Sequence, residues 1–113
     1  MKRLALISHD NKKIDLLAWA NYNRETLRRF HLLATATTGR FLREKVGLAI
    51  VARVGAREID AVFFFVDPLT AQPHDPDIQA LMRVCNVQNI PLATNLAAAD
   101  LIITGLTAAE GQA

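Results

Sequence analysis

The sequence predicts an α/β fold in which helices cover both faces of a parallel sheet, a three-layer α/β/α arrangement. Short apolar runs alternate along the chain with longer stretches whose apolar residues recur at helical spacing. The most apolar run, residues 61–66, is β-branched and aromatic, which is typical of a strand buried on both faces. Polar residues follow directly after the runs, at the strand ends where open α/β sheets place ligands.

Length and composition indicate a single globular domain over residues 1–113. Apolar residues make up 51% of the chain and charged residues 21%, which excludes a disordered protein. No apolar run approaches the ~20 residues of a membrane span, so we expect no membrane partner. The single cysteine, Cys85, excludes an internal disulfide and a multi-cysteine metal site. It also fits a reducing cytoplasm.

Charge is divided unevenly along the chain. Residues 1–57 hold twelve Lys/Arg and four Asp/Glu, whereas residues 58–113 hold one Lys/Arg and seven Asp/Glu. Such a division is compatible with a nucleic-acid surface, a contact between copies, or an anion site facing a carboxylate base. The basic residues are not interleaved with aromatic ones, so we expect no nucleic-acid partner.

The first predicted strand covers residues 4–8. Asp10 follows it and can cap a helix that begins near Asn11. In that helix Ile14, Leu17 and Ala18 form the expected buried stripe.

His9 and Lys13 flank this predicted helix start. His9 is either a structural imidazole or a ligand-binding group, because it stands at the carboxyl end of a strand. Lys13 falls in the first helical turn, where the positive end of the helix dipole disfavours a cation. A nearby anion would explain a lysine at that position.

The second strand, residues 32–34, leads into the turn Thr35-Ala36-Thr37-Thr38-Gly39. Small hydroxylated residues at a helix start leave backbone N–H groups free for an anion and add hydroxyl donors. The spacing of nucleotide-binding loops is absent, which favours a smaller phosphate. Residues 40–58 then read as a helix that is bent at Gly47.

A proline-rich polar loop follows the Phe-rich strand. Asp75 and Pro76 fit an N-cap and the first position of the next helix. Capping leaves Asp67, His74 and Asp77 unexplained, and a titratable cluster at a strand end indicates a functional site.

The remaining chain predicts a helix near residues 76–87, a strand over 90–94 and a last helix over 96–103, with a frayed tail from Thr104. A proline in a strand is tolerated near the start of the strand or on an edge strand. The strand over residues 90–94 therefore has its proline near its start or lies at a sheet edge. The residues expected to face the core from the first of these helices are Ile78, Leu81, Met82 and Cys85.

These residues together resemble the methylglyoxal synthase family over residues 4–99. The matching segments are His9-Asp10 with Lys13, the turn at residues 35–39, FFVDPL at 64–69, PHDPD at 73–77, ALMR at 80–83 and IPLATN at 90–95. The resemblance implies a metal-free and cofactor-free cytoplasmic enzyme, usually hexameric. It would convert dihydroxyacetone phosphate to methylglyoxal and phosphate.

The resemblance also implies roles for individual residues. Phosphate would be held by His9, Lys13, Thr35, Ala36, Thr37 and Thr38. His74 would lie at the carbonyl and hydroxyl oxygens of the substrate. The carboxylates of the pocket would be Asp10, Asp67 and Asp77.

Two departures from the family pattern affect these expectations. Ala36 stands where the family has a glycine, and alanine would be strained there if the position had positive φ. After Gly47-Leu48 the chain is about fourteen residues shorter than the family pattern. The absent segment is a strand ending in Ser-Gly-Pro and a Gly-Gly-Asp-x-Gln loop that carries the principal catalytic base.

We therefore expect a four-stranded sheet that lacks the family's edge strand, and a slow or inactive enzyme. Three hypotheses follow. In the first, the chain is a methylglyoxal synthase. In the second, it is a non-catalytic domain of the same fold that binds a phosphorylated metabolite. In the third, it is a truncated scaffold that self-associates through an exposed strand.

Overall fold

The computed structural model describes residues 2–53, 59–69 and 75–111, with the backbone alone at 51–53, 75–78 and 110. A five-stranded parallel sheet with the order β3-β2-β1-β4-β5 forms its centre. The strands are β1 (Arg3–Ser8), β2 (His31–Ala34), β3 (Ile50–Arg53), β4 (Ala61–Phe65) and β5 (Leu92–Ala93). The predicted α/β class is confirmed.

The sheet has one strand more than the four expected. β3 pairs with β2 in parallel and forms the edge that was expected to be missing, so β2 is not exposed there. The segment that forms β3 had been assigned to a helix over residues 40–58. In the structure the helical turn ends at Val46, and Gly47 adopts a left-handed conformation with φ of 76°. Glycine accepts this conformation without strain, which lets the chain leave the helix.

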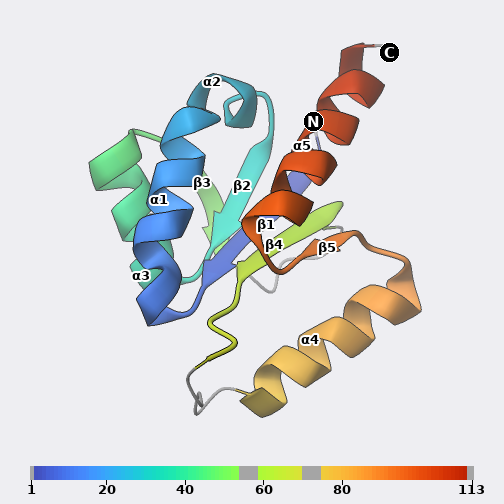
Figure 1. The fold of residues 1–113 in the computed structure, drawn as a ribbon. Helices are drawn as coiled ribbons and strands as arrows, with labels where there is room; N and C mark the ends of the chain where they lie inside the picture. The colour runs from blue at the N-terminus through green and yellow to red at the C-terminus, as the bar shows by residue number, and fades with distance from the viewer. Residues whose placement is uncertain (1, 54–58, 70–74, 112–113) are drawn as a thin grey trace.

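Seven helical segments lie in the described ranges (Figure 1). The first is a short 3-10 turn, η1, at Asp10–Lys12, which runs directly into α1. A π-helical turn, η2, continues α3 in the same way. Their bounds are η1 (Asp10–Lys12), α1 (Lys13–Tyr22), α2 (Arg24–Leu27), α3 (Ala36–Phe41), η2 (Leu42–Val46), α4 (Asp75–Gln88) and α5 (Leu96–Gly111).

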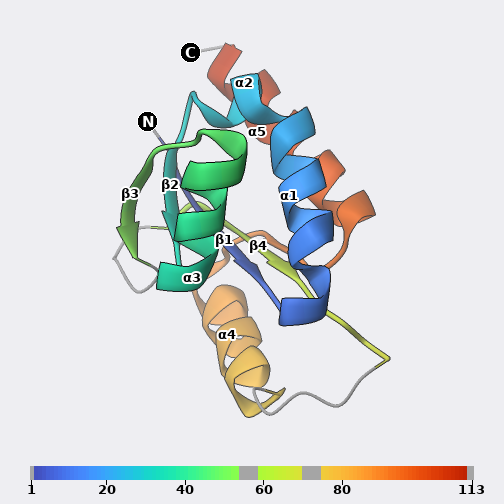
Figure 2. The ribbon, with the colours of Figure 1, turned by 90° about the vertical axis from the view of Figure 1, so that its left-hand side faces the viewer.

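The helices form two layers around the sheet because alternate strand residues point to opposite faces. On one face Leu4, Leu6 and Phe63 pack with buried residues of α1, α2, η2 and α5. On the other face Ala5, Val62 and Phe64 pack against α4 through Cys85. Both views place α4 across the sheet from α1 and α5 (Figures 1 and 2). The sandwich is the expected three-layer arrangement.

Cys85 is a core residue, as predicted, with 2% of its surface exposed. Burial raises the pKa of its thiol, because the charged thiolate is disfavoured away from water. Met82, expected to face the core beside it, is 37% exposed. No helix in the described ranges is long and apolar enough to cross a membrane.

Two further helix predictions differ from the structure. The buried face of α1 is formed by Leu16, Trp19 and Ala20, whereas Ile14 is 80% exposed. The Trp19 indole donates to Asp100 Oδ1 at 3.0 Å, which ties α1 to α5. Unlike the predicted last helix, α5 continues through Gly111 instead of fraying at residue 104. Alanine and leucine, which favour helix, stand on both sides of the weak helix formers at residues 102–105.

Candidate active site

His9 joins the ends of β1, the central strand, and its neighbour β4. Its backbone N–H donates to Phe65 O at 3.0 Å, and the Asp67 N–H donates to its Nδ1 at 2.9 Å. The ring meets Phe64 edge-on with 5.2 Å between centroids, and only 4% of the residue is exposed. Because Nδ1 accepts a hydrogen bond, the proton of the neutral ring lies on Nε2.

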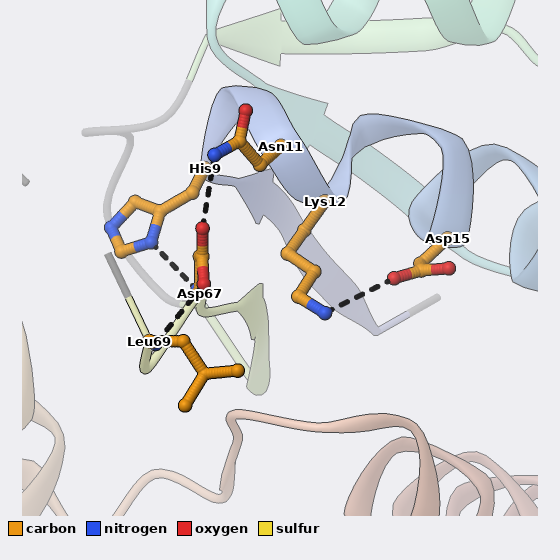
Figure 3. A network of polar contacts seen from close by, with 6 residues as sticks. All are labelled: His9, Asn11, Lys12, Asp15, Asp67 and Leu69. Atoms are coloured by element: carbon orange, nitrogen blue, oxygen red, sulfur yellow. Dashed lines mark hydrogen bonds and ion pairs between the residues drawn. The ribbon is translucent and has the colours of Figure 1, made fainter.

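The Asp67 carboxylate is oriented by hydrogen bonds at both oxygens (Figure 3). Oδ2 accepts from Asn11 Nδ2 at 3.0 Å, and Oδ1 accepts from the Leu69 N–H at 3.1 Å. The second bond is a local turn that Asp often forms with the backbone two residues on. The first spans 56 residues of sequence, and no pattern in the sequence indicated it.

Two buried polar atoms beside this junction have no hydrogen-bond partner within the described part of the chain. They are Ser8 Oγ and His9 Nε2. In Figure 3 the second ring nitrogen of His9 points away from Asp67. A buried N–H without an acceptor costs about 1–3 kcal/mol, so His9 Nε2 is a donor suited to a ligand oxygen.

The side chain of Lys13 reaches from α1 to α3. Its Nζ lies 3.0 Å from Asp10 Oδ1 and 5.4 Å from the centre of the Phe41 ring. Asp10 was expected to cap a helix, but the structure places it inside η1 with His9 at the N-cap. Its carboxylate is 92% exposed. The structure therefore brings Lys13 against Phe41, the last residue of the helix that begins at the threonine turn.

The threonine turn starts α3, as predicted. Thr35 is the N-cap, and its hydroxyl accepts from the Thr38 N–H at 3.4 Å. The N–H groups of Ala36 and Thr37 stand in the first turn of the helix, where no carbonyl of the helix can accept from them, and both residues are exposed. Thr38 is buried, with 2% of its surface exposed. The turn thus presents two backbone donors beside exposed threonine side chains.

Ala36 causes no strain in this turn. The only non-glycine residue with positive φ in the described ranges is Asn89. Ala36 is the first residue of α3 and has helical backbone geometry. Replacement of the family's glycine by alanine therefore leaves the turn intact.

A cavity of about 510 Å³ opens beside the junction, at the ends of β4 and β5. Its polar wall is formed by Lys12 and Asp15, whose Nζ and Oδ2 lie 3.5 Å apart. None of the predicted site residues whose side chains the structure describes lines it, and sequence reasoning did not find it. The lining residues are Lys12, Asp15, Phe65, Val66, Pro68, Thr94, Asn95, Leu96 and Ala97.

Two predicted catalytic residues cannot be placed beside this junction. His74 lies outside the described residues, and Asp77 is described by its backbone alone, in the first turn of α4. α4 begins at Asp75, so the predicted start of this helix is right to within one residue. Among the described residues no group of three or more His, Cys, Asp or Glu could hold a metal ion.

Comparison with known proteins identifies the fold and the family. A crystal structure of methylglyoxal synthase from Elizabethkingia anophelis superposes with a TM-score of 0.82 and 38% identity, over 90% of this chain and 76% of that one. Methylglyoxal synthase from Clostridium botulinum strain Alaska E43 is 49% identical over 89% of this chain and 97% of its own length. The chain belongs to the methylglyoxal synthase family.

A second methylglyoxal synthase, from Carboxydothermus hydrogenoformans, is 48% identical over 94% of this chain and 99% of its own length. No protein-family model matches the chain. The predicted resemblance is confirmed, and the function of the chain is that of a methylglyoxal synthase, a carbon–oxygen lyase.

The alignments also bear on the shortened segment. The match to the Clostridium enzyme runs over 115 positions but covers 89% of the 113-residue chain, which is about 101 residues. About 14 of the aligned positions therefore face a gap in this chain. This number agrees with the segment of about fourteen residues missing after Gly47-Leu48.

Proposed function

We propose that this methylglyoxal synthase converts dihydroxyacetone phosphate to methylglyoxal and inorganic phosphate without a metal or cofactor. A base removes a proton from the hydroxymethyl carbon beside the carbonyl. The resulting enediolate expels phosphate by breaking its carbon–oxygen bond, and the hydroxyl proton of the former hydroxymethyl carbon is released so that this carbon becomes the aldehyde. The enolate left behind takes up a proton at its methylene carbon to give methylglyoxal. The proposal is supported chiefly by identity of up to 49% to methylglyoxal synthases over nearly the whole chain.

The substrate phosphate is bound between Lys13 and the threonine turn. The N–H groups of the exposed residues Ala36 and Thr37 and the hydroxyls of the exposed threonines of this turn supply neutral donors. Lys13 supplies the positive charge, which explains a cation in the first turn of a helix. The ammonium exchanges its partner Asp10 for phosphate, and the Asp10 side chain, which is 92% exposed, stays in water.

Asp67 is the described carboxylate best placed to receive the proton. It lies at the centre of the carboxyl edge, and its oxygens are oriented by two hydrogen bonds. Asp10 is less suited, since it is exposed and paired with Lys13. His9 Nε2 donates to the developing enediolate oxygen, where a preorganised donor stabilises negative charge. His74 and Asp77 keep the pocket roles that the family resemblance implies.

The missing segment limits the rate. A well-positioned base contributes about 10²- to 10⁴-fold to such a proton transfer. We expect turnover slower than in full-length relatives by a factor within that range.

The shortened segment also favours a second candidate, a domain that binds a phosphorylated metabolite without turning it over. One experiment separates the two. Purified protein is mixed with dihydroxyacetone phosphate, and methylglyoxal and phosphate are measured together. Equal amounts of both products support the lyase. A rise in melting temperature with phosphate but no product supports the binding domain.

Assembly and location follow the family. We expect a homo-oligomer, a hexamer as is usual in the family, in the cytoplasm. Light scattering of the purified protein tests the assembly. A monomer at micromolar concentration would contradict it.

A further inference from the structure

We infer that Asn11 is a positioning residue that aims the Asp67 carboxylate at the substrate. The inference rests on the proposed function, in which Asp67 receives a carbon-bound proton. The family resemblance gives Asn11 no role. The observation that carries the inference is the 3.0 Å hydrogen bond from Asn11 Nδ2 to Asp67 Oδ2.

This bond fixes the plane of the carboxylate. The backbone N–H of Leu69 holds Oδ1, and Asn11 holds Oδ2 from the end of another strand. Rotation of the carboxylate would break one of these two bonds. Two hydrogen bonds do not by themselves exhaust the capacity of a carboxylate to accept a proton, because it has about four acceptor sites.

Asn11 is itself held in place by the backbone. It lies in η1, which follows directly from β1. The Lys12 N–H donates to His9 O at 2.9 Å and closes this turn. His9 in turn receives the Asp67 N–H. The carboxylate is therefore aimed from the end of β1, while its own backbone extends from β4.

The chemistry of the three side chains at 11–13 suits this role. Each pairs with a different carboxylate: Asn11 with Asp67, Lys12 with Asp15 at 3.5 Å, and Lys13 with Asp10 at 3.0 Å. Figure 3 shows Lys12 turned away from Asp67 and toward Asp15. Asn11 orients the carboxylate with a neutral amide, which adds no charge of its own.

Orientation of this kind affects rate more than binding. A catalytic group must be held within about 0.5 Å and 10–20° of its productive geometry. A misplacement of about 1 Å can cost 10²-fold in turnover. Asn11 is exposed and adds nothing to the core, so its replacement should leave the fold intact.

The test compares Asn11→Asp, Asn11→Ala and Asn11→Gln with wild type. Asn21→Asp is the matched control, because Asn21 is exposed near the far end of α1 and its replacement makes the same change in charge. Phosphate release from dihydroxyacetone phosphate gives kcat and KM. Melting curves with and without inorganic phosphate report the fold and the anion site.

We expect Asn11→Asp to lower kcat by about 10²-fold, because two carboxylates would then face each other. Asn11→Ala should lower kcat less, and Asn11→Gln should recover part of that loss by restoring an amide donor. KM should stay within twofold of wild type. The melting temperature, and its rise on addition of phosphate, should stay within a few degrees of wild type. Asn21→Asp should match wild type throughout.

Three results would overturn the inference. The first is equal kcat in Asn11→Asp and Asn21→Asp. The second is a parallel loss of turnover, phosphate protection and melting temperature, which would mean a structural role only. The third is the absence of product from wild type, which rejects the proposed function itself and this role with it. The first two results can be seen only when wild type is active. Failure of the inference about Asn11 is therefore distinguishable from failure of the proposed function.

Discussion

The junction between β1 and β4 and the threonine turn after β2 lie on the same edge of the sheet, yet they are built differently. At the junction, His9 and Asn11 reach across to Asp67 and bond both its backbone and its carboxylate. At the turn, the Thr38 N–H donates to Thr35 Oγ1 and Arg43 Nε donates to Gly39 O, both within the helical segment that the turn begins. The residues that begin α3 stay exposed.

The difference matches two different chemical needs. A proton acceptor must be aimed, so its environment is filled with directional bonds. An anion site must offer donors that the protein itself does not use, so its N–H groups are left open. We therefore expect changes at the junction to lower kcat and changes at the turn to weaken phosphate binding.

The largest effect is expected from Asp67→Asn. The amide keeps the size of the side chain but cannot accept a proton from carbon. We expect kcat to fall by about 10²- to 10⁴-fold, with phosphate protection unchanged. Asp15→Asn makes the same chemical change at the nearby cavity and should leave kcat within twofold. Similar rates for both variants would place the base elsewhere.

Lys13→Met tests the role of the threonine turn and Lys13 in phosphate binding. Loss of a charged hydrogen bond to phosphate removes about 1.5–3 kcal/mol, which corresponds to roughly 10- to 150-fold in affinity. The affinity for inorganic phosphate, measured by calorimetry, should fall by that factor. Lys45→Met on the exposed surface of η2 is the control. An unchanged phosphate affinity in Lys13→Met would remove Lys13 from the anion site.

Thr35→Ala should act on stability. It removes the N-cap bond of α3, which is worth about 1 kcal/mol. Urea unfolding should show that loss, and Thr35→Ser should restore most of it. If serine fails to restore stability, the hydroxyl is not the group that matters.

Ala36→Gly is expected to have the smallest effect. Since Ala36 has no positive φ, glycine relieves no strain and costs at most about 0.5–1 kcal/mol of stability. Phosphate release should stay within twofold of wild type. A large gain in activity on restoring the family's glycine would show that alanine does impair the turn.

The elements that sequence reasoning found are those with strong local signals. The Phe-rich strand is too apolar and aromatic to lie anywhere but in the interior of the sheet. The Thr35–Gly39 turn was recognised because N-cap chemistry depends on neighbouring residues only. The family was recognised from short segments that surround these elements.

The elements that sequence reasoning missed depend on distant residues or on weak local signals. Residues 50–53 are a short apolar run that fits a helix or a strand equally well, and pairing with β2 decides for the strand. The buried face of α1 was misassigned because apolar residues occupy most of its positions. The bond from Asn11 to Asp67 joins residues 56 apart, and only the ends of β1 and β4 bring them together.

The central claim is that this shortened methylglyoxal synthase still removes the carbon-bound proton, and that this step limits its rate. The most direct measurement compares ordinary dihydroxyacetone phosphate with substrate deuterated at the hydroxymethyl carbon. We predict methylglyoxal and phosphate in equal amounts, formed more slowly from the deuterated substrate at saturation. No product would contradict the claim of turnover. Equal rates from the two substrates would contradict the claim that proton removal is limiting.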